Sequence, residues 1–390
     1  MPAVSFRISA AHMSRLHDPS GPTGTMRVLV LGAGGFLGAR IVVGLLSRGH
    51  DVICAGRSPR AIERRFPSCA VMHADLGRDD ASTWRPKLAG IDAVVNAAGV
   101  LRGDLDQVHH HGPVALFEAC AQANLSRVVQ ISALGAGEQS SSRFLLTKQQ
   151  ADEAMVRLRQ ERGAVGWCVL RPSLVIGRGG GSTALFCAVA AMPGPLRLGP
   201  GSWRVQPIHV TDLGRIVADL LACAAMPPLL NVVGPEEMTT DALTLGLRNW
   251  LGLPPARLLT IPRSGLAIAA RIGDALPGFS LTSESLTMLA RGNTADSRPL
   301  PDLLGWTPRP LFVALAAEPA VAADLWHARL LPLRGLLIGA LAVIWVGSGV
   351  ASFVLPQTDA DALLSGLGLS GVAALAVTWA GAALDVVLGL

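Results

Sequence analysis

A strand, a glycine-rich turn and a helix follow one another in residues 26–48, MRVLVLGAGGFLGARIVVGLLSR. The aliphatic run from Val28 to Leu31 is typical of a strand that is buried on both faces. Apolar residues then return at helical spacing at Leu37, Ile41 and Leu45. A buried strand that enters a helix through glycines predicts an α/β fold built on a parallel sheet.

The glycines of this turn indicate a phosphate site. Glycines at these positions let the chain turn sharply, let the backbone approach a pyrophosphate, and let the helix pack on the strand, while the helix N-terminus supplies free N–H groups. The spacing departs from the strict G-x-G-x-x-G pattern, so a turn that binds no nucleotide is the alternative. The residues expected to bind a dinucleotide here are Gly32, Gly35, Phe36, Leu37 and Gly38.

Two arginines follow the second expected strand, Asp51 to Ala55. In a doubly wound fold the end of this strand faces the adenosine ribose, where an acidic residue favours NAD and an arginine accommodates the 2′-phosphate of NADP. Arg57 and Arg60 therefore favour NADP(H), with NAD(H) as the alternative cofactor. In a chain this rich in arginine, a solvated side chain without a ligand is the other interpretation of Arg57.

Polar and small residues follow the further expected strands. These strands are Val71 to His73, Ile91 to Val95, Arg127 to Ile131 and Gly166 to Arg171. Open parallel sheets bind ligands at the carboxyl ends of their strands, so we expect these positions to line the cofactor. They are Asp75, Leu76, Asn96, Ala97, Ala98, Gly99, Arg171, Pro172 and Ser173, with Ser132 after the fifth strand.

The histidines and cysteines indicate no metal site. His109 to His111 are consecutive, so they cannot all face one ion from a helix, and we expect a solvated helix start there. His209 stands beside a helix cap near Asp212 and is interpreted as structural. The six cysteines are scattered without metal-ligand spacing and are expected to be reduced.

The basic side chains are almost all arginines. Of the 33 basic residues only Lys87 and Lys148 are lysines, and the chain has no tyrosine. The net charge of +5 suits nucleotide phosphates or a membrane surface, and no basic patch interleaved with aromatic residues predicts a nucleic-acid partner.

Taken together, these motifs resemble the extended and atypical short-chain dehydrogenases/reductases. The chain is similar to the branch of NAD(P)-binding, epimerase-like proteins that includes the nucleotide-binding accessory subunit of respiratory complex I. The resemblance covers about residues 26 to 320 and implies a doubly wound Rossmann sheet, an NAD(P)(H) cofactor and a small C-terminal subdomain over the substrate. It rests on the glycine turn, the strand-end residues above, Lys148 and the PIHVTD run at 207–212.

The resemblance also implies catalytic positions. Active members use a serine, a tyrosine and a lysine four residues after the tyrosine, and the matching residues here are Ser132, Phe144 and Lys148. A phenylalanine cannot transfer a proton. Two hypotheses follow: an oxidoreductase of a carbonyl or alcohol, lipid-like or quinone-like, with an altered acid–base step, or a non-catalytic NADP(H)-binding scaffold or redox sensor.

The composition changes after residue 330. Two long apolar runs within residues 331–390 are each long enough to cross a bilayer, with a short acidic loop between them. Arg329 and Arg334 flank the first run, so the positive-inside rule predicts an inner-membrane protein with its large domain in the cytoplasm. A buried hairpin of a soluble protein is the alternative. The tail resembles DoxX-like membrane domains, which usually have four helices, so we expect a truncated copy.

The expected organisation has four parts. Residues 1–25 form a disordered leader, 26–200 the NAD(P)-binding Rossmann domain, 201–325 the substrate subdomain and 331–390 the transmembrane hairpin. The expected partners are a small-molecule substrate and the lipid bilayer. The sequence does not identify protein partners.

Overall fold

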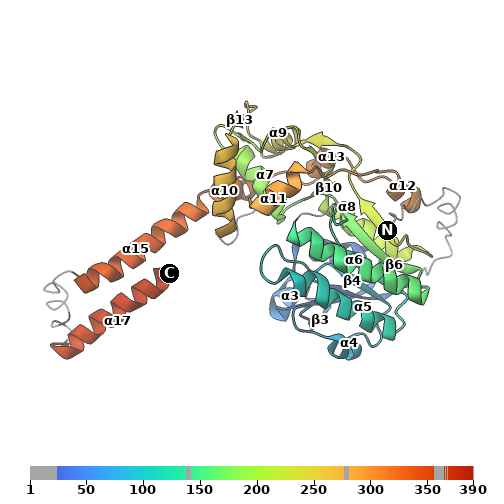
Figure 1. The fold of residues 1–390 in the computed structure, drawn as a ribbon, viewed down its shortest axis with the longest axis horizontal. Helices are drawn as coiled ribbons and strands as arrows, with labels where there is room; N and C mark the ends of the chain where they lie inside the picture. Colours follow the sequence, from blue (N-terminus) through green and yellow to red (C-terminus); the bar gives the residue numbers. More distant parts are fainter. Residues whose placement is uncertain are drawn as a thin grey trace. The chain divides into compact units, whose positions relative to one another are not determined.

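The computed structural model describes residues 24–137, 142–275, 281–354, 364, 366 and 368–389. The chain divides into two compact units, one that ends at Val321 and one that comprises Ala322–Leu390 (Figure 1). The expected leader lies outside the described residues except for its last two positions, and the expected acidic loop at Asp359 and Asp361 lies outside them entirely. Each unit is described below by itself.

A seven-stranded sheet forms the centre of the first unit. Its spatial order is β11-β6-β5-β4-β1-β2-β3, and every pair of neighbours is parallel. Since β1 pairs with both β2 and β4, the strand order reverses there, which is where doubly wound sheets bind ligands. The Rossmann fold class is therefore confirmed. The strands are β1 (Arg27–Leu31), β2 (Asp51–Gly56), β3 (Ala70–His73), β4 (Ala93–Asn96), β5 (Arg127–Ile131), β6 (Gly166–Pro172) and β11 (Leu229–Val232).

Helices cover both faces of this sheet (Figure 1). Val28 and Val30 of β1 pack into one hydrophobic cluster, whereas Leu29 and Leu31 pack into a second cluster on the opposite face. This alternation explains why the strand is apolar at every position. The first cluster lies under α2 (Phe36–Ser47), α3 (Pro59–Arg65), α8 (Val210–Ala222) and α12 (Pro299–Leu304); the second lies under α4 (Ala81–Lys87), α5 (Gly112–Gln122) and α6 (Arg143–Arg162).

The remainder of the first unit consists of short strand pairs and helices. Glu284 of α11 (Ser283–Ala290) accepts a hydrogen bond from the backbone N–H of Phe144 at 2.9 Å, so this region reaches the start of α6. The strand pairs are β7 (Val175–Ile176) with β10 (Ile208–His209), β8 (Leu196–Arg197) with β13 (Leu259–Thr260), and β9 (Arg204–Val205) with β12 (Met238–Thr239). The other helices are α7 (Gly181–Ala191), α9 (Thr240–Trp250), α10 (Arg263–Ala275) and α13 (Leu311–Ala316), and a π-helical turn, η1 (Gln107–His111), precedes α5.

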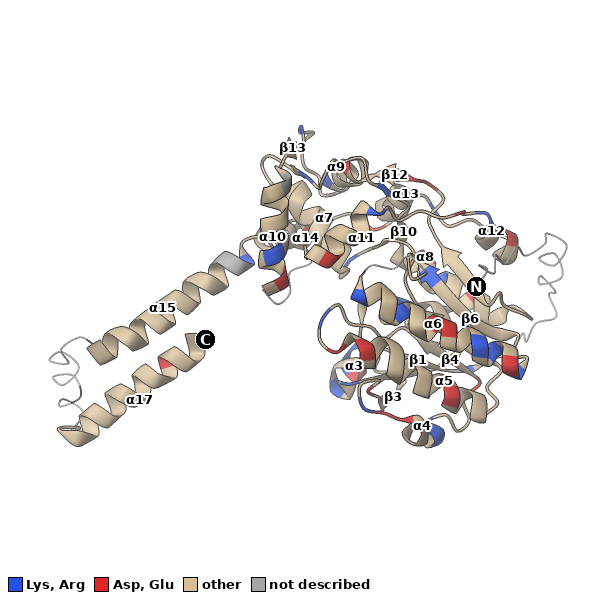
Figure 2. Ribbon diagram, viewed as in Figure 1, with Lys and Arg blue, Asp and Glu red and all other residues tan. Residues whose placement is uncertain are grey.

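The second unit comprises α14 (Ala322–Leu330), α15 (Arg334–Val354) and α17 (Val372–Gly389). Helices α15 and α17 pack closely at Gly349, where a Cβ would lie 2.6 Å from the carbonyl oxygen of Ala382, and Ser348 donates a hydrogen bond to Asp385 at 3.0 Å. Figure 2 shows both helices almost free of charged residues.

Both helices are long and apolar enough to cross a membrane. Leu337–Val354 and Val372–Gly389 have mean hydropathies of 2.1 and 1.8, and only 6% and 11% of these two stretches are buried. By length and composition, these two stretches could therefore cross a membrane.

Candidate active site

The turn after β1 has no room for a side chain at Gly32 or Gly38. Gly32 has a φ of +76°, and a Cβ there would lie 2.8 Å from the backbone nitrogen of Ala98. A Cβ on Gly38 would lie 2.1 Å from the carbonyl oxygen of Gly32, and one on Gly35 would lie 3.1 Å from the same atom. The glycines thus have the geometric roles that the sequence predicts: a sharp turn and close contact between helix and strand.

Helix α2 begins directly after this turn, at Phe36, and no side chain caps its N-terminus. The first N–H groups of a helix have no partner within the helix, so those of Phe36 and Leu37 are available to an anion. The ring of Phe36 packs on Gly180, where a Cβ would lie 2.7 Å from the ring.

Three arginines follow β2, the strand whose Ala55 carbonyl oxygen accepts the N–H of Gly32. Arg57 and Arg60 follow β2 and are exposed. Arg65 of α3, which the sequence analysis missed, donates a hydrogen bond from Nη1 to the carbonyl oxygen of Gly34 at 3.2 Å. The positive charge near the expected adenosine end is therefore larger than the sequence motif indicated.

The structure gives Asp75 and Lys87 local partners. The carboxylate of Asp75 accepts the N–H of Gly77 at 2.9 Å, which shapes the turn after β3, and the neighbouring Leu76 is buried. Lys87 forms an ion pair of 2.6 Å with Asp79. Of the two lysines, Lys148 alone lies at the strand ends.

A buried amide pair holds the end of β4. Asn96 donates from Nδ2 to Oε1 of Gln130 on β5 at 2.8 Å and accepts the N–H of Ala98 at 3.2 Å. These bonds hold Ala97 and Ala98 against the glycine turn. The small residues that the sequence analysis expected to leave room for a ligand are therefore positioned by the side chain that precedes them.

Lys148 is a buried ammonium group. Its Nζ donates to the carbonyl oxygen of Ile131 at 3.0 Å, and a Cβ on Gly99 would lie 3.6 Å from it. Burial lowers the pKa of Lys148 to about 8, although the nearby charge of Asp152 opposes this shift. An ammonium has three N–H donors, and within the described residues Ile131 is the one acceptor found. Two donors of Lys148 remain for a ligand.

Ser132 is held by a carboxylate that the sequence analysis missed. Its hydroxyl donates to Oδ2 of Asp152 at 2.8 Å, and Arg171 donates from Nε to the same oxygen at 2.8 Å. Burial raises the pKa of Asp152, against the opposing effect of Arg171. Because Asp152 stands one helical turn after Lys148, the i, i+4 spacing was an available signal.

His109 lies beside Phe144, and the expectation of a solvated helix start is wrong for this residue. The two rings make an edge contact with centroids 5.0 Å apart, and His109 is fully buried. Its Nε2 accepts the N–H of Val100 at 3.0 Å. Burial, with a smaller effect from the charge of Lys148, lowers the pKa of His109 to about 3, so the imidazole is neutral at physiological pH.

The remaining candidate residues have structural contacts. Ser173 donates to the carbonyl oxygen of Gln206 at 2.6 Å, and the carbonyl oxygen of Pro172 accepts the N–H of Leu134 at 2.9 Å. His209 pairs through Nδ1 with Thr211 at 2.7 Å, which agrees with a structural role. No cluster of three metal-ligating side chains occurs within the described ranges.

Comparisons with known proteins agree with this geometry. The model of the NAD dependent epimerase/dehydratase family matches residues 28–232, which is more than half of the chain. A 2-alkyl-3-oxoalkanoate reductase of Stenotrophomonas maltophilia is 29% identical over 250 residues, 57% of this chain and 73% of that protein. The mitochondrial NADH dehydrogenase [ubiquinone] 1 alpha subcomplex subunit 9 of Arabidopsis thaliana is 26% identical over 255 residues, 60% of this chain and 62% of that protein.

Solved structures support the fold. A UDP-N-acetylglucosamine 4-epimerase from Bacillus cereus is similar with a TM-score of 0.57 at 17% identity, covering 75% of this chain and 95% of that one. A dTDP-glucose 4,6-dehydratase from Bacillus anthracis in complex with NAD has the same TM-score at 15% identity, covering 80% and 97%.

We predict that Lys148→Met stabilises the ligand-free protein and weakens its binding of NADPH at least tenfold. In the wild-type protein the buried ammonium with its unused donors lowers the free energy of unfolding by on the order of 1–3 kcal/mol. The variant removes this group. This cost is present below pH 8. It disappears as the pH rises toward 10.5, because in that range the folded protein loses the proton of Lys148 while the unfolded chain keeps it.

Thermal unfolding across pH and nucleotide titration would measure both effects. Lys87→Met is the matched control: it removes an ion pair, so it should lower stability and leave nucleotide binding unchanged. A Lys148→Met protein that is less stable than wild type at pH 7 would contradict the assigned role.

Proposed function

The chain belongs to the NAD dependent epimerase/dehydratase family, and from this premise we propose that it is a membrane-tethered, NADP(H)-binding oxidoreductase. Its substrate is a carbonyl or alcohol compound of lipid-like or quinone-like character. The observation that carries the proposal is the buried ammonium of Lys148, which lies at the carboxyl end of β5 with two donors unused in the described structure. Ribose hydroxyls of a dinucleotide are acceptors of the required kind.

The residues present fit a dinucleotide. Added Cβ atoms at Gly32 and Gly38 would collide with backbone, so glycine at these positions allows the tight turn and the close packing of helix on strand that a dinucleotide site uses. The open N-terminus of α2 adds N–H donors. Arg57 and Arg60, with Arg65 nearby, support NADP(H) over NAD(H), because a 2′-phosphate needs cationic partners.

Bound NADPH would supply a hydride to the substrate's carbonyl carbon, and the carbonyl oxygen then needs a proton from the protein. Phe144 has none to give, and the proton of the Ser132 hydroxyl points to Asp152. His109 is neutral and its Nε2 is an acceptor. Lys148 is the remaining acid near these residues: its ammonium donates one N–H proton to the oxygen and regains a proton from water.

A lipid-like substrate is supported by two independent observations. The relative from Stenotrophomonas maltophilia is named as a reductase of 2-alkyl-3-oxoalkanoates, which are carboxylates with a ketone at C3 and an alkyl group at C2. Helices α15 and α17 would hold the catalytic unit at a bilayer, where such substrates concentrate. With Arg329 and Arg334 on the cytoplasmic side, the tail is assigned to the inner membrane as a DoxX-like hairpin.

A non-catalytic NADP(H)-binding scaffold or redox sensor is the second candidate. Phe144 in place of the family's tyrosine favours it, and so does the tie between Ser132 and Asp152, which draws the hydroxyl away from a substrate. The similarity to a subunit of the NADH dehydrogenase complex supports the same interpretation.

For the cofactor, we predict that the protein binds NADPH at least tenfold, or about 1.4 kcal/mol, more tightly than NADH. Arg57→Asp should remove or invert this preference, because the new carboxylate repels a 2′-phosphate. Nicotinamide fluorescence titration measures both affinities. Arg64→Asp on α3 makes the same change of charge and should keep the preference; equal affinities in the wild-type protein would refute the assignment of Arg57.

For the chemical step, Phe144→Tyr should raise the rate of carbonyl reduction by about 100 to 10,000-fold, the usual gain from general acid catalysis. The ring is retained and partly exposed, so the added hydroxyl costs little packing. The assay is NADPH oxidation with 2-alkyl-3-oxoalkanoates and simpler ketones. Phe144→Leu is the control, and its rate of reduction should not rise.

The double variant Phe144→Tyr, Lys148→Met should lose that gain. A folded Phe144→Tyr protein that binds NADPH and stays inactive on the whole panel would favour the scaffold or sensor.

For the tail, we predict that deletion of residues 333–390 releases the first unit from membranes as a folded protein. In the intact protein, Asp359→Cys should react with an impermeant maleimide added outside cells, because the loop lies on the far side of the membrane. Arg85→Cys on α4 is the cytoplasmic control and should react only after permeabilisation. The reverse labelling pattern would show that the orientation is wrong.

A further inference from the structure

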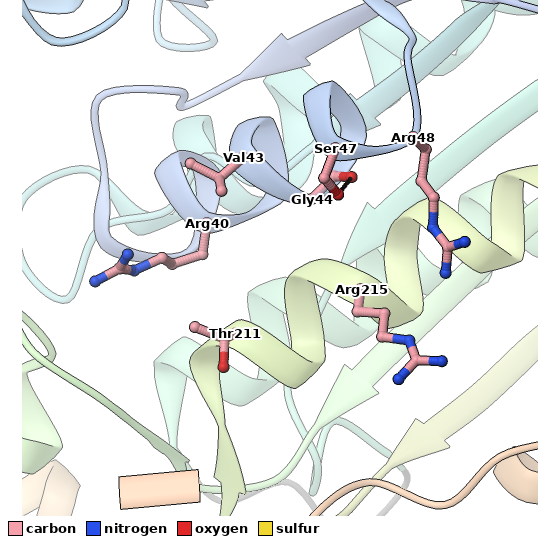
Figure 3. Close-up of a pocket in the computed structure, with 7 residues that line it drawn as sticks. All are labelled: Arg40, Val43, Gly44, Ser47, Arg48, Thr211 and Arg215. Carbon is pink, nitrogen blue, oxygen red and sulfur yellow. Dashed lines mark hydrogen bonds between the residues drawn. The ribbon is translucent and has the colours of Figure 1, made fainter. Parts of the chain in front are cut away.

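A groove of about 340 Å³ runs between α2 and α8 on the surface of the first unit. It is lined from α2 by residues between Arg40 and Arg48 and from α8 by Thr211 and Arg215 (Figure 3). We call it the α2–α8 groove. Its volume is within the range of roughly 300–1,000 Å³ typical of small-ligand sites. None of the residues assigned above to the cofactor lines it.

Gly44 lines the groove and packs on Gly214 of α8. A Cβ on Gly44 would lie 2.5 Å from the carbonyl oxygen of Gly214, and a Cβ on Gly214 would lie 2.5 Å from that of Arg40. The two helices therefore touch backbone to backbone. Val43, which is half exposed, lines the groove next to Gly44, so the stretch between Arg40 and Arg48 includes an apolar surface.

At one end, two guanidinium groups are held in fixed orientations. Arg48 pairs with Asp219, and Arg215 pairs with the same carboxylate at 3.4 Å. The guanidinium of Arg215 also stacks on the ring of Trp306 at 3.8 Å, and Trp306 donates from Nε1 to Asp219 at 2.9 Å. Asp219 thus accepts from three donors, and one negative charge faces two positive charges.

At the other end lies Arg40, which Figure 3 shows well separated from Arg48 and Arg215. Arg40 and Arg48 are eight residues apart on one helix, or roughly 12 Å along its axis. Within the described part of the chain, no carboxylate pairs with Arg40. The α2–α8 groove therefore has a cationic site at each end.

The hydroxyl groups of the groove are already used. Ser47 donates to the carbonyl oxygen of Gly44 at 2.7 Å, and Thr211 accepts from Arg309 at 2.8 Å and pairs with His209. The polar groups of the groove that remain for a ligand are thus mainly the guanidinium groups of its arginines. A planar guanidinium group can donate two parallel N–H bonds to the oxygens of one phosphate group.

We propose that the α2–α8 groove binds an elongated ligand that carries two phosphate groups, one at Arg48 and Arg215 and the other at Arg40. A less polar linker between the phosphates lies over Val43 and Gly44. Such chemistry occurs in soluble bisphosphates and in the headgroup of a diphosphatidyl lipid, and the experiment below distinguishes these sources.

The test is calorimetric titration of the full chain in a neutral detergent with saturating NADPH present, so that the cofactor site is occupied. The titrants are fructose 1,6-bisphosphate against inorganic phosphate, and cardiolipin against phosphatidylcholine, each in the same detergent. We expect at least one bisphosphate to bind at least tenfold more tightly than its matched titrant. Binding of the sugar alone identifies a soluble ligand, and binding of cardiolipin alone identifies a lipid.

Arg40→Gln should weaken the binding of the bisphosphate at least tenfold without affecting the fold, because no ion pair is lost. Arg85→Gln, on the exposed surface of α4, is the matched control and should have no effect. Either of two results overturns the proposal: neither bisphosphate is preferred over its matched titrant, or the two variants weaken binding equally. NADPH affinity, titrated separately, reports on the proposed function independently.

Discussion

The carboxyl ends of β1 and β4 meet through a contact between two backbones. Gly32 lies against Ala98 with no space for a Cβ, and Gly38 closes the turn from the helix side. The amide pair of Asn96 and Gln130 holds β4 in this position. The switch point of the sheet, the open start of α2 and the position of Lys148 relative to Gly99 all depend on this contact. A side chain at Gly32 or Gly38 would separate these elements.

Around that contact the protein buries polar groups whose hydrogen-bonding capacity is not fully used within the described residues. Lys148 has one acceptor for three donors, and Oδ1 of Asp152 has no partner there. Buried polar groups without partners reduce the stability of the folded protein, so their presence here favours the interpretation that these groups bind a ligand. Phe144 changes the chemistry of the site and leaves the nearby Lys148 and Asp152 buried.

Six strands of the sheet were predictable because each is marked by a local aliphatic run and is followed by glycine or a polar residue. The sequence analysis missed β11, and it expected α8 and α12 in the substrate subdomain although they pack on this sheet. The conformation of the glycine turn was predictable for the same reason. His109 was misjudged because its burial depends on Phe144, 35 residues later in the sequence. Asp152 and Arg65 were missed because their partners, Ser132 and Gly34, come from other elements. Local patterns carry no information on such contacts, apart from the spacing of Lys148 and Asp152 on one helix.

The small number of lysines allows a direct test of the central claim, that the ammonium of Lys148 holds the dinucleotide. Protein labelled with ¹³C at lysine Cε should show two signals, from Lys148 and Lys87. In the free protein the Lys148 signal should titrate with a pKa of about 8. Saturating NADPH should shift this signal and raise its pKa, because ribose acceptors stabilise the charged form, and it should leave the Lys87 signal unchanged. A Lys148 signal with the same position and pKa at saturating NADPH would contradict the account.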